Sequence, residues 1–173
     1  MSFSFYDATI IAAKHNLDGL SHILEVAEQQ PNASTLPSAR LYEDMRPLSS
    51  QIHLAAQAIE RMLARFNGEE HVPIEDKIQT FEDMRQRIRS AYEALDRTDR
   101  DTINRIGDET APTVLTPEMT VNMTGAAFAL GASMPNIFFH LTIAYAILRS
   151  QGVPLGKWDY IQPFMNYQLA KAA

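Results

Sequence analysis

The sequence predicts an all-α fold, a four-helix bundle formed by one domain that spans residues 1–173. Four segments repeat apolar side chains in alternating steps of three and four residues, which is the spacing of one face of a helix. These segments are 6–29, 48–66, 81–95 and 137–148. A chain of 173 residues suits a single domain and buries about two-thirds of its unfolded surface. Four amphipathic helices in one domain are most simply accommodated by a bundle.

The first and third helices carry start signals. Ser4 and Asp7 have the spacing of a capping box, in which a hydroxyl and a carboxylate satisfy free N–H groups at the helix start. Thr80 and Asp83 have the same spacing before the third segment. The aspartates also suit the positive end of the helix dipole. The first helix is therefore expected to begin at its pair. For the third helix, Ile74 and Ile78 could extend the apolar stripe backwards, so its start stays open by several residues.

The second helix begins near Pro47 and ends at Gly68, because a missing N–H costs nothing in a first turn and glycine suits the residue past the end. The connections between the helices are long: 31–46, 67–79 and 98–124. Thirteen residues reach about 40 Å, enough to return along a helix of about 27 Å. Parallel neighbours are therefore allowed, and spacing alone leaves the topology open.

The last helix extends upstream through residues 125–130 but contains Pro135. Proline lacks the N–H that would bond the carbonyl of Gly131 and its ring crowds that carbonyl. One kinked helix is expected rather than two separate ones. Gly152 and Pro154 provide the stop.

Two shorter features complete the predicted architecture. Residues 113–115 and 119–122 are β-prone runs on either side of 116–118, so a small β-hairpin is expected within 112–122. Residues 153–173 form a C-terminal aromatic tail that is expected to pack on the bundle. Its aromatic residues are Trp158, Tyr160, Phe164 and Tyr167.

Composition excludes several classes of protein. The chain has no cysteine, so it has no disulfide framework, cysteine nucleophile or iron–sulfur cluster. Its 15 basic and 21 acidic residues give a formal net charge of −6, which argues against a nucleic-acid-binding surface. The first residues lack the basic and apolar regions of a secretory signal, so a cytoplasmic setting is expected.

One uncharged run, from Met119 to Leu148, is long enough to cross a bilayer. Asn122, Asn136 and His140 lie within it, and polar side chains are costly in lipid. The sequence therefore predicts a buried core helix here, and no membrane contact.

Three of the five histidines show no clear site. His15, Asp18 and His22 share one face of the first helix, but this face lies roughly 170° from the apolar stripe at 100° per residue. A surface location is therefore expected for this cluster. His71 lies in a loop and has no visible partner.

His53 and His140 are the stronger candidates. His140 lies at the edge of the buried face of the last helix, one turn after Asn136, and His53 flanks the stripe of the second helix. Facing helices of a bundle can hold a metal in this way. Spacing alone favours the simpler interpretation, a buried histidine satisfied by hydrogen bonds.

Several segments resemble a known family. The run Met134-Pro135-Asn136-Ile137-Phe138-Phe139-His140, followed by Ala144–Arg149 and Gly152–Lys157, resembles an uncharacterised bacterial and fungal family of the DinB/YfiT-like superfamily. Shorter matches occur at Tyr6–Ala8 and at 39–48. The resemblance covers nearly the whole chain. It implies an up-down-down-up four-helix bundle that is usually a homodimer.

The resemblance also implies a metal site. The superfamily includes metal-dependent thiol S-transferases and a thiol-dependent isomerase, whose site resembles one histidine on the second helix and a His-x-x-x-His pair on the last. His53 and His140 match two of these positions, and Asn136 replaces the third. An amide oxygen is a weaker ligand for zinc or nickel than imidazole. The expected metal ligands are therefore His53, His140 and Asn136, holding zinc, nickel or iron weakly or not at all.

Two classes of function stay open at this point. The first is a metal-dependent thiol transferase or related enzyme with a degenerate metal site. The second is a non-catalytic bundle that binds a small molecule or serves as a dimeric structural protein. The sequence identifies no substrate.

Overall fold

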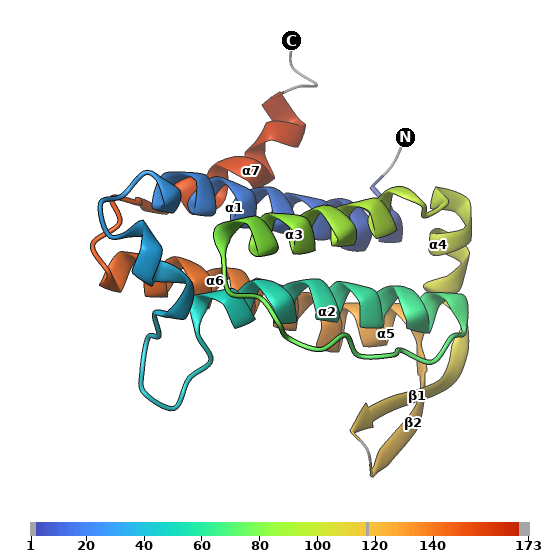
Figure 1. Ribbon diagram of the computed structural model, residues 1–173. Coiled ribbons are helices and arrows are strands. Elements are labelled where there is room, and N and C mark those ends of the chain that lie inside the picture. Colours follow the sequence, from blue (N-terminus) through green and yellow to red (C-terminus); the bar gives the residue numbers. More distant parts are fainter. Residues whose placement is uncertain (1–2, 117, 170–173) are drawn as a thin grey trace.

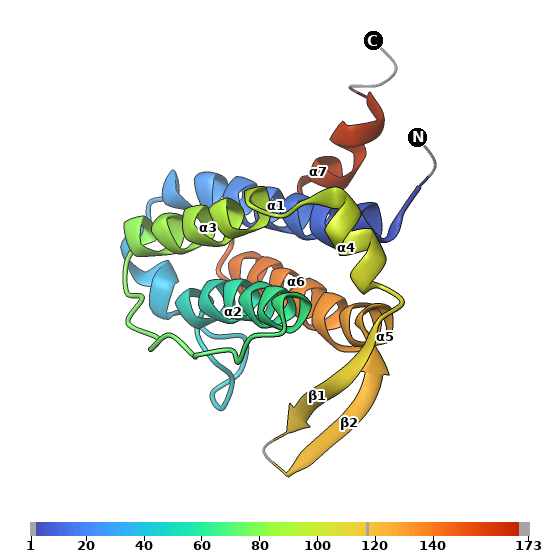
Figure 2. The same ribbon diagram turned by 90° about the vertical axis from the view of Figure 1, so that its right-hand side faces the viewer.

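The computed structural model describes residues 3–116 and 118–169, and it contains a bundle of four long helices. Figures 1 and 2 show the bundle as two layers from two directions. One layer holds α1 (Ala12–Glu28) and α3 (Phe81–Asp96), and the other holds α2 (Leu48–Asn67) and α6 (Met134–Ser150). The predicted all-α bundle is confirmed.

The core lies between these layers and is built from the predicted apolar stripes. Its largest side chains with almost no exposed surface are Ile10, Leu17, Leu20, Ile23, Leu24, Leu36, Leu48, Ile52, Ile59, Met62, Met84 and Leu95. Each buried aliphatic side chain of this size contributes about 1.5–3 kcal/mol relative to exposure. The apolar stripes therefore supply the main driving force for folding.

Ion pairs fix the directions of α1 and α3. Lys14 near the start of α1 pairs with Asp96 at the end of α3, with Nζ and Oδ1 2.6 Å apart. Glu28 at the end of α1 pairs with Arg85 near the start of α3. The two helices are therefore antiparallel.

The helices α2 and α3 run in the same direction. Arg87 of α3 binds Glu60 of α2, with Nη2 and Oε2 2.7 Å apart. Farther along both helices, Asn67 and Arg97 line one hollow. The connection, residues 68–80 in the structure, returns across the bundle, as its length allows (Figure 1).

The helices α2 and α6 are antiparallel. Gln51 near the start of α2 contacts His140 in α6, whereas Arg61 shares a hollow with the earlier residue Asn136. Together with the two preceding relationships, this gives the up-down-down-up order. The topology that the resemblance implied is confirmed.

The first helix begins at the expected capping box. Ser4 N–H donates to the carboxylate of Asp7 at 3.0 Å, and Asp7 N–H donates to Ser4 Oγ at 3.4 Å. One π-helical turn, η1 (Asp7–Ile11), precedes α1. Arg100 also binds the Asp7 carboxylate, so the cap is tied to a distant segment.

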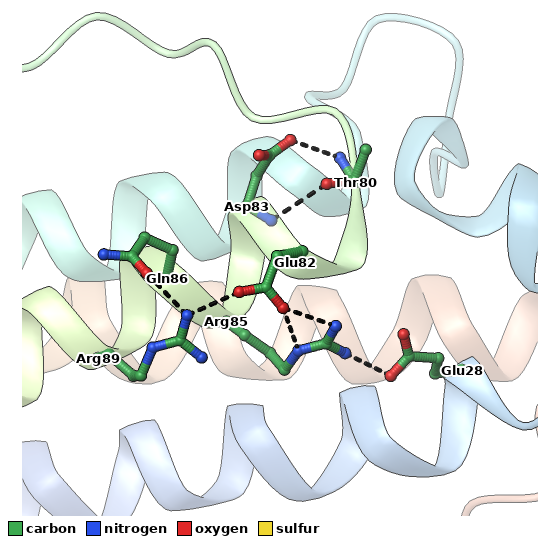
Figure 3. Close-up of polar contacts among 7 residues, drawn as sticks. All are labelled: Glu28, Thr80, Glu82, Asp83, Arg85, Gln86 and Arg89. Carbon is green, nitrogen blue, oxygen red and sulfur yellow. Dashed lines mark hydrogen bonds and ion pairs between the residues drawn. The ribbon is translucent and has the colours of Figure 1, made fainter.

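The predicted capping box of α3 is also present, as Figure 3 shows. Asp83 N–H donates to Thr80 Oγ1 at 3.1 Å, and Thr80 N–H donates to the Asp83 carboxylate at 2.9 Å. Next to it, the Glu82 carboxylate accepts from Arg85 and Arg89, and Arg85 reaches across to α1. This surface network links the cap to the α1–α3 contact.

The predicted hairpin is present and is longer than expected. It consists of β1 (Thr110–Thr116) and β2 (Met119–Thr124), antiparallel, with an irregularity in register after Val114. It projects from one end of the bundle (Figure 2). A short helix, α4 (Arg100–Ile106), leads into it and is capped by Asp99, which accepts from Thr102 N–H.

Residues 125–150 form one continuous helical segment, as expected. It comprises α5 (Gly125–Phe128), the π-helical turn η3 (Ala129–Ser133) and α6. The π turn immediately precedes Pro135, where the sequence predicted a disturbance of the hydrogen-bond ladder. By length and composition, this segment could cross a membrane, but helices in the core of a soluble protein often have the same properties. Here α6 packs against α1 and α2.

Three helices are not among the predicted elements: the 3-10 helix η2 (Ala33–Ser38), α4, and α7 (Lys157–Leu169) within the tail. The helix α7 packs on α1, and its later part rises away from the bundle (Figure 1). The aromatic residue Tyr167 lies outside the part whose side chains are described. The predicted surface location of the cluster holds for Asp18, which is exposed, but needs correction for His15 and His22, which α7 partly covers.

The contacts of α7 explain this correction. His22 Nε2 and Asp159 Oδ1 are 2.9 Å apart, and the ring of His15 meets that of Phe164 edge to face. Phe164 also contacts Phe138 of α6. The helix α1 therefore has a second packed face that its main apolar stripe does not reveal.

Candidate functional site

A chain of hydrogen bonds among buried groups joins the start of α2 to the middle of α6. His140 Nδ1 and Gln51 Oε1 are 2.9 Å apart, and the two residues are 8% and 3% exposed. The amide nitrogen of Gln51 donates to the carbonyl of Arg46 at 2.9 Å. Because the Arg46 carbonyl can only accept, it fixes the orientation of the Gln51 amide. The oxygen of that amide therefore faces the imidazole.

This orientation determines the tautomer of His140. Gln51 Oε1 can only accept, so His140 Nδ1 carries the proton and donates it. Burial lowers the pKa of His140 to about 4, so the ring is neutral at pH 7. Its Nε2 is then a lone-pair acceptor. This atom has no hydrogen-bond partner among the described residues.

His53 lies on another face of α2. At 100° per residue, His53 and Gln51 are separated by about 200° around the helix axis. Burial lowers the pKa of His53, while the nearby carboxylate of Asp76 and a hydrogen bond with the backbone of Ile74 raise it. Both of these residues belong to the connection 67–79. His53 therefore faces that connection, whereas Gln51 faces His140.

Asn136 is exposed and lies one turn before His140 on α6. It lines a hollow of about 60 Å³ together with Arg61, Phe128 and Ser133. Ser133 belongs to the π turn η3, and π turns inside helices are frequent at functional sites. The structure thus brings Asn136 and His140 to one helix but gives His53 different neighbours.

The described side chains can be compared with the ligands that a metal site of the superfamily would need. Protein zinc sites use at least three ligands. Within residues 3–116 and 118–169, no group of three or more His, Asp or Glu side chains is placed to hold a metal ion. His53 and His140 therefore belong to no such three-residue group among the described residues. The metal site at His53, His140 and Asn136 stays a prediction, and no chemical step is derived through a metal.

Sequence reasoning missed Gln51 and Arg46. Gln51 lies at the start of a helix, a position where a glutamine is ordinarily solvated, and only the packing of α6 buries it. The available signal was the rotational position of Gln51. It lies three, seven and ten residues before Leu54, Ala58 and Arg61, on the same face of α2.

Comparison with known proteins adds two similarities. Residues 5–161 match the model of a family described as "Domain of unknown function (DUF1993)". The crystal structure of a DinB family member protein from Shewanella denitrificans is 28% identical, with a TM-score of 0.78 and 90% of each chain covered. The comparison with curated proteins gave no match.

Proposed function

The chain belongs to the DUF1993 family and has a DinB-like fold, and on that premise we propose that it is a non-catalytic bundle that binds a small molecule at His140. The ligand donates a hydrogen bond from a thiol, hydroxyl or N–H group to Nε2 of His140. The observation that carries the proposal is the hydrogen bond from His140 Nδ1 to Gln51, because it leaves Nε2 as an oriented acceptor.

Orientation of the imidazole is the first argument. A ring held only by packing can rotate or change tautomer, but here Gln51 and the Arg46 carbonyl fix both properties. A buried amide and imidazole whose hydrogen-bonding groups were all used within the protein would have a structural role only. The acceptor Nε2, for which the described residues provide no donor, distinguishes this site from such a pair.

The pKa of about 4 argues for binding rather than proton transfer. A general base works best when its pKa is near the working pH. His140 titrates about three units below neutrality, so it accepts a hydrogen bond well but removes a proton poorly. This distinction favours the binding function over the enzyme.

The surroundings suggest an apolar or aromatic ligand body. The Phe139 ring lies beside the imidazole, with centroids 5.4 Å apart, and is 52% exposed. Aromatic contacts of this kind add about 0.5–1.5 kcal/mol beyond area burial. An aromatic thiol or alcohol therefore matches both the acceptor and the adjacent ring.

A second candidate is the metal-dependent thiol chemistry of the superfamily. Histidines that bind metals commonly donate their other ring N–H to an oxygen, and the Gln51–His140 pair has this arrangement. His140 and Asn136 would hold the ion, and a metal would supply a lowered thiol pKa. His53, the third predicted ligand, has Asp76 and Ile74 as neighbours, and this makes the metal-dependent function the weaker candidate.

A titration of histidine-labelled protein distinguishes the two candidates. Benzyl mercaptan is expected to shift the ¹⁵N resonance of His140 Nε2 in a saturable way, whereas benzyl methyl sulfide, which has no donor, leaves it unchanged. His140→Gln should abolish binding. His53→Gln is the matched control, because it removes a buried histidine on another face of α2 and should leave binding unchanged.

Metal content is measured in parallel by elemental mass spectrometry on tag-free protein never exposed to a chelator. Near-stoichiometric zinc, nickel or iron that disappears in His140→Ala would replace the proposal with the metalloenzyme. An unchanged Nε2 resonance in the presence of benzyl mercaptan would refute ligand binding at His140.

A further inference from the structure

A second hollow lies between the C-terminal half of α2 and the hairpin. It has a volume of about 250 Å³, and we call it the hairpin groove. Its walls include Arg61 and Arg65 of α2, His71 of the following connection, Thr113 of β1 and Phe128 of α5. The smaller hollow beside Asn136 shares Arg61 and Phe128 with it. Neither His140 nor Gln51 lines the groove, so it is distinct from that pair.

The two guanidinium groups in the groove are held in place by the hairpin. Arg65 donates from Nε to Thr113 Oγ1 at 2.7 Å and from Nη2 to the Met123 carbonyl at 2.9 Å. Arg61 donates from Nη2 to the Val114 carbonyl at 2.6 Å. These bonds use one edge of each group. The Nη1 atoms of both arginines have no hydrogen-bond partner among the described residues.

A preorganised guanidinium is suited to a carboxylate. Its planar fork matches the two oxygens, and little side-chain entropy is lost because the group is already fixed. The same groove contains His71, whose buried Nε2 has no partner in the described part of the chain. Because this atom has almost no exposed surface, the carboxylate is held by the two guanidinium groups rather than by His71.

The remaining walls limit the class of ligand. Phe128 lies under the Arg61 guanidinium, with the ring centroid 6.0 Å from Cζ, and Pro112 adds an apolar surface. Glu69 and Glu70 also line the groove. Two carboxylates beside two arginines disfavour a multiply charged anion such as phosphate, because the like charges repel.

We propose that the hairpin groove binds a small organic monocarboxylate with an apolar or aromatic body. The carboxylate lies against Arg61 and Arg65, and the body lies against the exposed Pro112 and Val114 and the small exposed part of Phe128. Inorganic phosphate and neutral analogues bind poorly. This site is independent of the proposed function at His140.

The test is a titration of ¹⁵N-labelled full-length protein with benzoate, benzamide and inorganic phosphate, followed by amide resonances. Benzoate is expected to give saturable shifts at residues 61–71 and 110–116. Benzamide and phosphate should bind there at least about tenfold more weakly. Benzamide has no charge, and hydrogen bonds between charged groups are stronger than those to neutral ones. Arg61→Gln should weaken benzoate binding about tenfold or more. Arg89→Gln, which changes an exposed arginine of α3, is the matched control and should bind as the wild type does.

Because Arg61 also holds the hairpin, Phe128→Leu serves as a second variant that keeps both cations. It should weaken benzoate binding several-fold and leave the selectivity over phosphate intact. Absence of saturable shifts in the wild type would overturn the proposal. So would equal binding of benzamide or phosphate at these residues, shifts centred elsewhere, or wild-type affinity in Arg61→Gln.

Discussion

Arg100 forms two hydrogen bonds with the carboxylate of Asp7, from Nη1 to Oδ2 at 2.9 Å and from Nη2 to Oδ1 at 3.0 Å. The pair joins α4 to the capping box of the first helix, although the two residues are 93 positions apart. A local start signal is thus stabilised by a distant cation. This arrangement has a measurable consequence at low pH.

Stability should decrease in acid as Asp7 becomes protonated. The hydrogen bond from Arg100 lowers the pKa of Asp7 from 3.8 to about 2. A lowered carboxyl pKa stabilises the fold above the unfolded value, and this contribution is lost as pH falls from about 4 through about 2. We expect this contribution to the free energy of unfolding to be about 1–2 kcal/mol, a figure that already allows for solvent around the partly exposed Arg100. Denaturant unfolding between pH 2 and 7 measures it.

Asp7→Asn should remove that part of the pH dependence. Asp101→Asn, on the exposed side of α4, is the control and should preserve it. An Asp7→Asn protein with the same acid profile as the wild type would contradict the assignment.

Acid should also act through His140. Burial lowers its pKa from 6.5 to about 4, so the unfolded chain takes up a proton first as the pH falls. This group's contribution is therefore fully present above about 6.5 and is lost as the pH falls toward 4. We expect a loss of about 1–3 kcal/mol by pH 4. NMR titration of the His140 ring checks the pKa directly, and a value near 6.5 would refute the prediction. His53, whose pKa burial also lowers, contributes in the same direction.

Gln51→Leu should destabilise the fold by about 1–3 kcal/mol, since it leaves the buried Nδ1–H of His140 without an acceptor. His140→Phe should also destabilise it, because the Gln51 oxygen loses its donor. The double variant should cost less than the sum of the two. Chemical denaturation of all four proteins measures the coupling. Strictly additive losses would show that the two side chains do not interact.

Gly125→Ala should destabilise the fold by about 1–3 kcal/mol. A Cβ at Gly125 would lie 2.5 Å from the carbonyl oxygen of Ile106, a backbone atom that cannot move away cheaply. Gly131→Ala is the matched control in the same helical segment, because no atom lies within 4 Å of the added Cβ. It should be neutral or slightly stabilising, by up to about 1 kcal/mol. Thermal unfolding compares them, and equal melting temperatures would disprove the steric argument.

Truncation after Gly156 should weaken the bundle and convert the expected homodimer to a monomer. It removes Asp159, Tyr160 and Phe164, which contact α1 and α6, and so exposes the second face of α1. Light scattering coupled to size exclusion measures the mass, and denaturant unfolding measures the stability. A monomeric wild-type protein would refute the dimer prediction. Full stability of the truncated chain would show that α7 is dispensable.

Local chemistry made much of the fold predictable. Thr80 and Asp83 form the expected capping box because all the groups involved lie within four residues. The turn at Gly68 has a positive φ of 70°, a conformation that glycine adopts without strain. The hairpin followed from β-prone runs on either side of a turn, although its length exceeded the prediction. Such features depend on neighbours in the chain, which the sequence states directly.

The candidate site was predictable only in part. His140 and Asn136 were identified, since their spacing of four residues places them together on any helix. Gln51 was missed, and His53 was expected to share a site with His140. To predict whether Gln51 or His53 faces His140, one must know the rotation of α2 about its axis relative to α6 to within a fraction of 100°. Apolar stripes are too broad to define that rotation.

The sequence alone accounts for the four long helices, the capping boxes of the first and third, the hairpin and the uncharged core segment, because periodicity and capping are short-range properties. Tertiary packing decided which face of α2 meets His140, which atoms fix its tautomer, and that α7 covers the far face of α1. These outcomes depend on contacts between residues as far apart as Gln51 and His140, or His22 and Asp159. Such contacts form only when all the helices pack together.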